Sequence, residues 1–281
     1  MIKNKRILIT GGSGSIGSEL VRQLAPNNKI FILDINETST FALRSELKQK
    51  GFWVHSRNGD VKDPATVSDV FEDFKPQIVF HAAALKHVTP GEEYPLEHIQ
   101  TNILGTYNVI AEAKRWECLE KFVFISTDKV VNANCIMGIT KLCAEGLVKR
   151  SGEKFVAVRF GNVMGSRGSV VPIWQKQFDN GQPITVTDER MERYMMTIPD
   201  ACELVIKAAE SGKNGEVYIL QMGPKVNVLE LATEIVKRSG AKNDIKVTGI
   251  RPGETLDEKL MTHEELSRAK LTEDKKFWIV T

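Results

Sequence analysis

The feature that most constrains the fold of this chain is a glycine-rich turn that joins a short apolar run to a helix-length stretch near its first residues. The run Arg6–Thr10 is followed by the letters GGSGSIG, which place glycines at positions 11, 14 and 17. Positions without a Cβ let backbone N–H groups and the positive N-terminus of a helix approach a pyrophosphate closely. The spacing therefore predicts the first strand, turn and helix of a dinucleotide-binding sheet.

The first 160 residues alternate short apolar runs with amphipathic stretches of helix length. This alternation is typical of a parallel sheet covered by helices on both faces. It predicts an α/β fold with a doubly wound parallel Rossmann sheet. The expected strands are Arg6–Thr10, Ile30–Leu33, Phe52–His55, Ile78–His81, Phe122–Ser126 and Phe155–Phe160, and the expected helices are Ile16–Leu24, Thr38–Lys50, Pro64–Phe74, Leu96–Trp116 and Met137–Ser151.

The sequence pattern changes after Gly161, where glycines and prolines divide the chain into shorter elements. We interpret residues 1–160 as the dinucleotide-binding domain and residues 161–281 mainly as a smaller C-terminal substrate lobe. A helix over Pro199–Ser211 and a strand over Glu216–Leu220 follow the earlier pattern. Residues 199–222 are therefore expected to return to the Rossmann domain.

Composition argues against several classes of protein. A formal charge of +2 and 26% charged residues indicate neither disorder nor a nucleic-acid partner. The longest apolar runs are far shorter than the roughly 20 residues that a membrane span needs, and no signal peptide is expected. The four cysteines, Cys118, Cys135, Cys143 and Cys202, have the spacing of neither a zinc site nor a disulfide framework, so we expect no metal and a cytoplasmic protein.

An acidic residue at the end of the second expected strand indicates the kind of dinucleotide. Asp34 lies about 20 residues beyond the glycine turn, where a carboxylate accepts hydrogen bonds from the adenosine ribose. A carboxylate there repels a 2′-phosphate, so NAD is favoured, and NADP stays possible because Arg44 or Arg57 could soften that preference. The alternative role of Asp34 is to cap a helix.

Two further loops are expected to hold the cofactor. The GDV letters after the third strand would set Asp60 and Val61 against the adenine, and the small residues after His81 would let the nicotinamide half pass close to the backbone. The candidate cofactor-binding residues are Gly11, Ser13, Gly14, Ser15, Ile16, Gly17, Asp34, Asp60, Val61, Ala82, Ala83 and Ala84.

Seven motifs together resemble a known family. TGGSGSIG, GDV, HAAALKHV, TNILGT, STDK, RFGNVMGSRGSVVP and RPGE are similar to those of the extended short-chain dehydrogenases, and specifically of the UDP-N-acetylglucosamine 4,6-dehydratase group, over Ile7 to about Glu258. The resemblance implies a reaction in which hydride moves from sugar C4 to NAD(P)+, water is eliminated across C5 and C6, and the hydride returns to C6. It also implies that the C-terminal lobe binds a UDP-linked amino sugar.

The resemblance assigns the chemistry to the end of the fifth strand. Thr127 would hydrogen-bond the C4 hydroxyl, Asp128 would protonate the leaving C6 hydroxyl, and Lys129 would remove the C5 proton. An amine that acts as a base needs a lowered pKa, from burial or from the charge of Lys141, and an acid needs the opposite shift. The alternative is that Asp128 caps a turn and Lys129 is solvated.

One position departs from the usual pattern of the superfamily. Lys141 is expected to hold the nicotinamide ribose, and the residue four positions before it is normally a tyrosine that takes the C4 proton. Here it is Met137, as in some larger members of the group, and methionine cannot transfer a proton. The C4 proton must leave through Thr127 and water, through Lys129 or through Asp128, or it does not leave at all. Cys135 could supply a thiolate, although packing is the ordinary role of a buried free cysteine.

The substrate would be held from several loops. By resemblance Lys86 orients the hexose, and His87 either faces the same crevice or caps a helix. A UDP diphosphate calls for a forked cation, for which Arg193 and Arg251 are the candidates; a surface ion pair is the alternative role of each. The candidate substrate-binding residues are Lys86, His87, Asn162, Arg167, Ser169, Val170, Arg193, Arg251 and Glu254.

The leading hypothesis is thus an NAD(P)-dependent UDP-N-acetylhexosamine 4,6-dehydratase in nucleotide-sugar biosynthesis for surface polysaccharide or protein glycosylation. Residues 89–92 and 130–135 differ from the segments usual in that group. They leave open a C4 oxidase or C5 epimerase of a modified UDP-amino sugar, and a non-catalytic dinucleotide-binding regulator is a third possibility. By resemblance, the protein is expected to form a homodimer or larger oligomer through its fourth and fifth helices.

Overall fold

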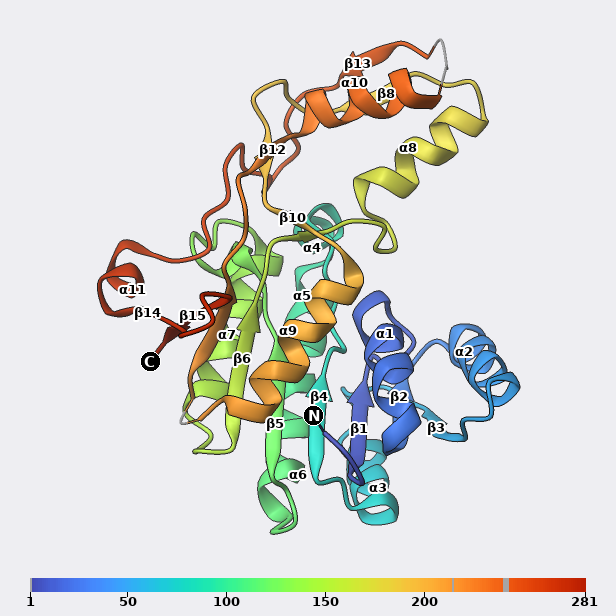
Figure 1. The fold of residues 1–281 in the computed structure, drawn as a ribbon, viewed down its shortest axis with the longest axis vertical. Coiled ribbons are helices and arrows are strands. Elements are labelled where there is room, and N and C mark those ends of the chain that lie inside the picture. The colour runs from blue at the N-terminus through green and yellow to red at the C-terminus, as the bar shows by residue number, and fades with distance from the viewer. Residues whose placement is uncertain (1, 214, 240–242) are drawn as a thin grey trace.

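The molecule is built on a nine-stranded sheet with the order β14-β15-β11-β6-β5-β4-β1-β2-β3, seen in a computed structural model that describes residues 2–213, 215–239 and 243–281 (Figure 1). The strands from β11 to β3 are parallel, whereas β15 pairs antiparallel to β11 and β14 pairs antiparallel to β15. The strands are β1 (Arg6–Thr10), β2 (Lys29–Asp34), β3 (Val54–Asn58), β4 (Ile78–His81), β5 (Lys121–Ile125), β6 (Phe155–Arg159), β11 (Val217–Leu220), β14 (Lys270–Leu271) and β15 (Phe277–Val280).

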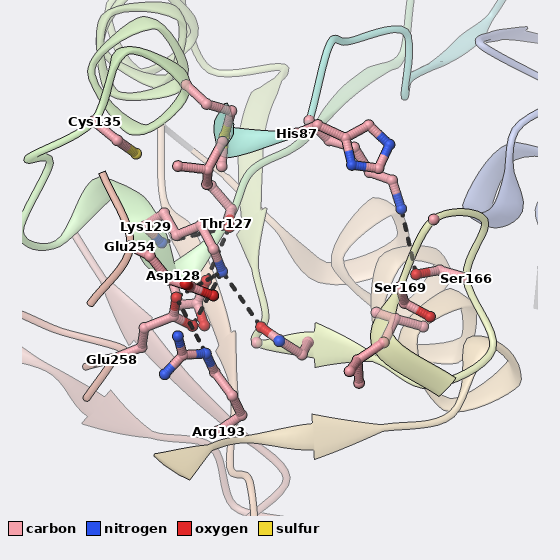
Figure 2. Close-up of a pocket in the computed structure, with 18 of the residues that line it drawn as sticks. His87, Thr127, Asp128, Lys129, Cys135, Ser166, Ser169, Arg193, Glu254 and Glu258 are labelled. Carbon is pink, nitrogen blue, oxygen red and sulfur yellow. Dashed lines mark hydrogen bonds and ion pairs between the residues drawn. The ribbon is translucent and has the colours of Figure 1, made fainter. Parts of the chain in front are cut away.

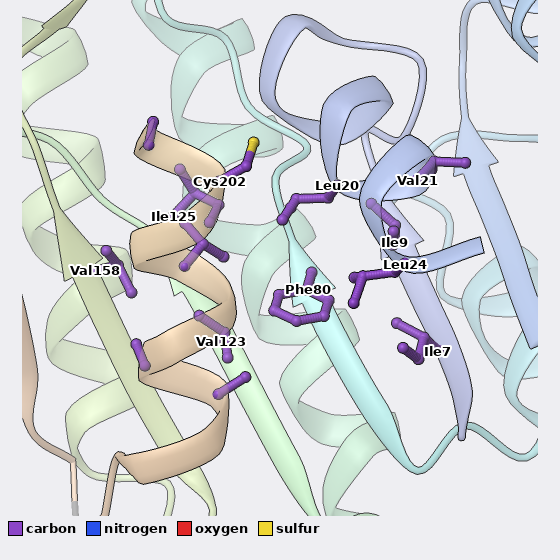
Figure 3. Close-up of a cluster of buried hydrophobic side chains, with 14 of the residues drawn as sticks. Ile7, Ile9, Leu20, Val21, Leu24, Phe80, Val123, Ile125, Val158 and Cys202 are labelled. Carbon is purple, nitrogen blue, oxygen red and sulfur yellow. The ribbon is translucent and has the colours of Figure 1, made fainter. Parts of the chain in front are cut away.

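Helices cover both faces of this sheet, so the predicted doubly wound fold is confirmed. Successive residues of β1 point to opposite faces: Ile7 and Ile9 belong to one buried cluster and Leu8 to the other. Figure 3 shows the first cluster beneath its helices. Each fully buried aliphatic side chain stabilises the fold by about 1.5–3 kcal/mol. The first face carries α1 (Ser15–Leu24), α2 (Glu37–Gln49) and α9 (Ile198–Ser211), and the second carries α3 (Pro64–Phe74), α6 (Thr106–Arg115) and α7 (Ile136–Lys149).

Some boundaries differ from those expected. The third strand begins at Val54 rather than Phe52. The expected helix Leu96–Trp116 is a continuous run of α5 (Pro95–His98), a π-helical segment η2 (Ile99–Gly105) and α6. The helical period of apolar residues does not distinguish one widened turn from an α-helix. The short elements that were not expected include the 3₁₀ segment η1 (Ala25–Asn27) and the helix α4 (Val88–Glu93).

A second, smaller lobe lies beyond the carboxyl ends of the parallel strands (Figure 1). Its core surrounds Trp174, which is 1% exposed and donates from Nε1 to the carbonyl of Thr185 at 2.8 Å. The lobe contains α8 (Val170–Asp179), β8 (Ile184–Val186), α10 (Val228–Ser239) and β13 (Ile245–Val247), and the short ladders β7 (Asn162–Val163) with β10 (Met195–Met196) and β9 (Glu192–Arg193) with β12 (Val226–Asn227) lead into it.

The chain passes between the lobes more than once. Helix α9 and strand β11 lie on the large sheet, where β11 pairs with β6. The chain then forms the rest of the small lobe and returns again as α11 (His263–Arg268), β14 and β15. The sequence alone assigns this last segment to the substrate lobe, because its strands are short and its turns carry no distinctive signal. No helix within the described residues has the length and apolar character needed to cross a bilayer.

Candidate functional site

A cavity of about 1100 Å³ lies at the carboxyl edge of the parallel strands. Its walls come from the glycine turn, from the ends of β4 and β5, and from the small lobe. The cavity thus opens where the order of the strands reverses, between β1 and β4, which is where ligands bind in open α/β sheets. Residues from segments far apart in the chain meet here, among them Gly14, Thr127, Lys141, Ser169, Arg251 and Glu258.

The glycine turn fits a dinucleotide. Gly11 has a φ of +65°, and a Cβ there would lie 2.6 Å from the backbone nitrogen of Ala83. A Cβ on Gly17 would lie 2.1 Å from the carbonyl oxygen of Gly11. No side chain caps the first turn of α1, and the buried hydroxyl of Ser13 has no hydrogen-bond partner among the described residues. The turn therefore leaves a helix N-terminus free to receive a phosphate.

Asp34 is held rigidly at the tip of β2. Its Oδ2 accepts from the backbone N–H of Ser13 and its Oδ1 from that of Asn36, both at 2.8 Å. The N-cap of α2 is Asn36, so the alternative role of Asp34 as a helix cap is wrong. Neither arginine that could have softened the preference for NAD points to it, because Arg57 pairs with Asp69 and Arg44 donates to the carbonyl of Val54.

The other expected cofactor contacts divide into two groups. Ser15, Ile16, Ala82 and Ala84 line the cavity. Ala83 packs against the glycine turn instead, Val61 is buried beneath Gly105, and the Asp60 carboxylate accepts from the backbone N–H of Lys62 at 2.9 Å. Asp60 and Val61 shape the loop beside the cavity, and their contact with an adenine stays a prediction.

Thr127, Asp128 and Lys129 meet at the base of the cavity, as the motif predicts (Figure 2). Thr127 is the N-cap of a single 3₁₀ turn, η3 (Asp128–Val130), and its hydroxyl donates to Asp128 Oδ1 at 2.9 Å. Lys129 Nζ lies 3.1 Å from Asp128 Oδ1, 2.9 Å from Glu258 Oε1 and 3.3 Å from Asn162 Oδ1. Asp128 is 1% exposed, so this is a buried ionic cluster and not a solvated turn.

The protonation of this cluster differs from what the sequence predicts. Burial acts to lower the pKa of the Lys129 ammonium, but the Asp128 and Glu258 carboxylates outweigh it and hold that pKa above its usual range. Burial likewise acts to raise the pKa of Asp128, and the Lys129 charge with hydrogen bonds from Lys129 and Thr127 outweighs it and lowers that pKa. Without substrate, therefore, the base is protonated and the acid is ionised.

Lys141 is buried in the wall of the same cavity. Its Nζ donates to the carbonyl of Ile125 at 2.5 Å and lies 3.9 Å from the centre of the Phe124 ring. Burial lowers the pKa of Lys141 to about 7, against a smaller opposing effect of Glu145. Lys141 therefore carries only part of a positive charge at neutral pH, which is less than the full charge expected from the sequence.

Met137 lines the cavity and is 3% exposed. Nearby, Cys135 caps α7, because its sulfur accepts from the backbone N–H of Gly138 at 3.3 Å. Burial, ahead of a weaker opposing hydrogen bond from Gly138, raises the pKa of the Cys135 thiol. The thiolate alternative is therefore disfavoured, and packing and capping describe this cysteine.

Lys86 and His87 follow a loop that a buried asparagine holds in place. Asn102 accepts from the backbone N–H of Leu85 at 2.8 Å and donates back to its carbonyl at 2.9 Å. Lys86 Nζ donates to Ser166 at 3.3 Å, which joins the loop to the small lobe. His87 is the N-cap residue of α4 but makes no side-chain cap; its ring fills the space beside Gly168.

Arg167 lies elsewhere than expected. Its backbone N–H donates to Ser15 Oγ at 3.0 Å, and its guanidinium donates to Ser39 Oγ at 3.1 Å and to the carbonyl oxygen of Ser13. The side chain therefore lies over the glycine turn and the start of α2, on the side of the cofactor. The local sequence could not reveal the direction of the Arg167 side chain, because the backbone path of its loop depends on Gly165 and Gly168, which both have positive φ.

The remaining substrate-binding candidates of the small lobe differ in whether their side chains are free to bind a ligand. Ser169 and Val170 begin α8, and the buried Ser169 hydroxyl has no partner among the described residues. The Arg193 guanidinium is 5% exposed and donates to the carbonyl oxygens of Glu192, Thr255 and Leu256, so it holds the chain and is not free for a diphosphate.

Arg251 is exposed at the rim of the cavity, and no described residue pairs with its guanidinium. The Glu254 carboxylate accepts from the backbone N–H of Arg251 at 3.2 Å and so closes this turn. Of the two arginines proposed for the diphosphate, Arg251 is the one whose side chain is available.

Glu258 is the principal site residue that sequence reasoning missed. It is 6% exposed and contacts Lys129, although the two positions are 129 apart in the sequence. Its only sequence signal is its place four residues after Glu254 in the segment that follows the RPGE motif.

Known proteins share the fold of this chain and much of its sequence. Residues 7–280 match the profile of a family described as polysaccharide biosynthesis protein. The capsular polysaccharide biosynthesis protein CapD of Staphylococcus aureus is 45% identical over 94% of this chain, which spans only 46% of CapD. Thus the chain spans about half the length of this curated relative.

Solved structures extend the similarity. The structure of Pen from Bacillus thuringiensis is 36% identical, with a TM-score of 0.92 over 99% of this chain and 88% of that one. The UDP-glucose 4-epimerase of Thermus thermophilus in complex with NAD is 25% identical, with a TM-score of 0.78 over 93% of this chain and 92% of that one.

Proposed function

Because the chain belongs to the polysaccharide biosynthesis protein family, we propose that it is an NAD-dependent 4,6-dehydratase of a UDP-linked N-acetylhexosamine. The observation that carries the proposal is the buried cluster at the end of β5, in which a carboxyl and an amine lie 3.1 Å apart at the base of the cavity. Elimination of water needs one group that gives a proton and one that takes it.

The glycine turn, Asp34 and Lys141 support NAD as the cofactor. The turn leaves room for a pyrophosphate, and the carboxylate at the tip of β2 disfavours a 2′-phosphate. The similar Thermus enzyme was solved with NAD. When bound, NAD supplies a hydride acceptor for the sugar and returns the hydride later in the cycle.

The residues of the cluster divide the proton transfers. Thr127 takes the C4 hydroxyl proton and gives its own hydroxyl proton to the Asp128 carboxylate through their 2.9 Å hydrogen bond. This relay replaces the tyrosine that is absent because position 137 is a methionine. The C4 ketone makes the C5 proton acidic, and the free amine of Lys129 removes it. The C5–H electron pair forms the C5=C6 bond, the C6–O bond breaks, and Asp128 returns its proton to the departing oxygen as water.

Binding of the nucleotide falls to the small lobe. Arg251 offers a guanidinium that no described residue pairs with, at the rim of the cavity, where a diphosphate would accept a forked pair of hydrogen bonds. Asn162 contacts Lys129 of the cluster and Lys86 contacts Ser166, and both would orient the hexose. The 4-keto-6-deoxy derivative of the UDP-N-acetylhexosamine would feed surface polysaccharide or protein glycosylation, and the free cysteines suit a cytoplasmic location.

The test is the mass of the product. The chain incubated with UDP-N-acetylglucosamine and NAD should convert it to a species lighter by one water. Lys129→Ala should lower turnover by at least about 10²-fold and leave UDP affinity unchanged, whereas Lys154→Ala, at an exposed position, should keep full activity. Water loss at the normal rate in Lys129→Ala would contradict the assignment of the base.

A second candidate is C4 oxidation or epimerisation on the same scaffold. The Thermus relative is a 4-epimerase, and Met137 removes the usual proton acceptor. An epimer has the mass of its substrate, so chromatographic separation of products without loss of water would favour this alternative. The intact group of Asp128, Lys129 and Lys141 speaks against a non-catalytic regulator.

A further inference from the structure

Glu258 brings a second carboxyl into the ionic cluster from the other lobe. Its Oε1 lies 2.9 Å and its Oε2 3.0 Å from Lys129 Nζ, so both oxygens face the amine (Figure 2). Arg193 Nε lies 3.6 Å from the same carboxylate, and the Arg193 fork fixes the segment just before it through Thr255 and Leu256.

The charges around Glu258 give it an unusual affinity for a proton. Burial comes first, and with the Asp128 carboxylate it outweighs the Lys129 and Arg193 charges to raise the pKa of Glu258 to about 7. The Cys135 thiol also interacts with Glu258, and burial raises the pKa of that thiol. Two carboxyls whose surroundings move their pKa values in opposite directions commonly have different roles.

The proposed reaction leaves a problem that Asp128 alone does not solve. Lys129 must be a free amine to remove the C5 proton, yet its two carboxylate neighbours hold it as an ammonium. Asp128 already receives the C4 proton through Thr127, and its lowered pKa makes it the weaker acceptor. The ammonium therefore needs a second acceptor in direct contact.

We propose that Glu258 is this acceptor: it takes a proton from the Lys129 ammonium before elimination and gives it back afterwards. The inference rests on the proposed dehydratase function. Glu258 acts through its contact with Lys129, so it is a positioning residue.

The protons balance over one cycle. At the start Lys129 is an ammonium, and Asp128 and Glu258 are carboxylates. The C4 proton reaches Asp128, and the Lys129 proton moves to Glu258. In the elimination, Lys129 takes the C5 proton and Asp128 gives its proton to the departing C6 oxygen. Lys129 then returns a proton to C5 as the hydride comes back to C6, and Glu258 restores the ammonium.

The test compares the pH dependence of turnover in Glu258→Gln with that of the unmodified chain. Glu258 must be ionised to accept a proton, so turnover of the unmodified chain should fall as the pH drops below about 7. The amide introduced by the substitution keeps the shape of the side chain but cannot take the proton. Turnover at neutral pH should fall by about 10²-fold and recover as the pH approaches the ordinary lysine pKa of about 10, with KM changed by less than about threefold.

Glu264→Gln serves as the matched control, because Glu264 lies on α11 with 82% of its side chain exposed. It should reproduce the pH profile of the unmodified chain. Equal loss of turnover at every pH in Glu258→Gln would indicate a purely structural role and overturn the proposal, as would unchanged turnover.

Infrared spectroscopy without substrate separates this inference from the proposed function. The carbonyl band of a protonated carboxyl should titrate near pH 7 in the unmodified chain and in Glu264→Gln, and be missing in Glu258→Gln. A band that persists in Glu258→Gln would mean that the proton resides elsewhere. If the band behaves as expected while no UDP sugar loses water, the dehydratase assignment fails and the proton exchange between Lys129 and Glu258 stands.

Discussion

At the scale of single residues, neighbours and not residue types decide which groups carry protons. Two lysines line one cavity with opposite shifts: two carboxylates raise the pKa of Lys129, whereas burial beside an aromatic ring lowers that of Lys141 to about 7. Burial, and then the Lys141 charge, lower the pKa of His81 to about 3. His81 is therefore a neutral bridge between Thr10 and Thr106 at physiological pH.

Arg167 offers a residue-scale prediction about the cofactor. Its side chain joins the glycine turn to Ser39, so it fastens the small lobe over the dinucleotide site. Arg167→Ala should weaken NAD binding by about tenfold, which is the loss of one charged hydrogen bond, and should change UDP affinity by less than about twofold. Calorimetric titration of both ligands would check this.

Arg190→Ala is a suitable control for that titration, because Arg190 is 71% exposed and pairs only with its neighbour Asp188 among the described residues. A larger loss of UDP affinity than of NAD affinity in Arg167→Ala would restore Arg167 to the substrate-binding residues.

At the scale of elements, a buried ionic group fastens the last segment of the chain to the sheet. Arg159 at the end of β6 is 2% exposed and pairs with Glu145 of α7 at 2.5 Å and with Glu265 of α11 at 2.8 Å. Thr262 and Glu265 also form a capping box at the start of α11. The segment that ends with β15 therefore docks beside the helix that carries Met137 and Lys141.

Arg159→Met should lower the free energy of unfolding by about 3–5 kcal/mol, because it leaves two buried carboxylates without a cation. Arg150→Met changes an exposed arginine that donates to the carbonyl oxygen of Gly146, and should cost about 1 kcal/mol or less. Urea unfolding of both variants would measure the difference. Equal midpoints would show that the ionic group contributes nothing.

The ionic group around Arg159 predicts that the protein becomes less stable at acid pH. Burial acts to raise the pKa of Glu265, but Arg159 outweighs it and lowers that pKa. A carboxyl whose pKa is lowered in the folded state stabilises the fold at pH values above its ordinary pKa. This contribution is lost as the pH falls through the folded-state pKa. The free energy of unfolding should therefore decline below about pH 4, and this decline should be smaller in Arg159→Met.

At the scale of the whole molecule, one helical face has the character of an interface. Exposed apolar side chains gather on η2, α6 and α7, which contact one another: Leu104 is 51% exposed, Tyr107 56%, and Ile139 and Leu142 43% each. Large apolar patches on soluble proteins mark sites of association. This face includes the helices through which the family resemblance predicts a dimer or larger oligomer.

Light scattering after size exclusion should therefore give twice the mass of the chain. Leu142→Glu should convert the dimer to a monomer, since a carboxylate in the centre of an apolar interface stays unpaired. Phe41→Glu, which changes a 71% exposed residue on α2, should remain a dimer. A monomeric unmodified chain would remove this prediction.

Local patterns in the sequence determined the larger part of the fold. The period of the apolar residues predicted the parallel strands β1 to β6, with a boundary error at β3, and also α9 and β11. The glycines at 11, 14 and 17 predicted a turn whose backbone approaches Ala83 too closely for any side chain. Such features are readable because each depends on residues within one or two turns of the chain.

Tertiary structure alone decided the protonation and partners of the site. Glu258 reaches Lys129 from 129 positions away, Arg193 binds backbone carbonyls instead of offering its fork to a ligand, and Arg167 turns toward the glycine loop. The strands β14 and β15 join the sheet only because β11 leaves an edge for them. Coulomb energies and burial depend on distance in space and on exclusion of water, and neither quantity is encoded in the spacing of residues along a chain.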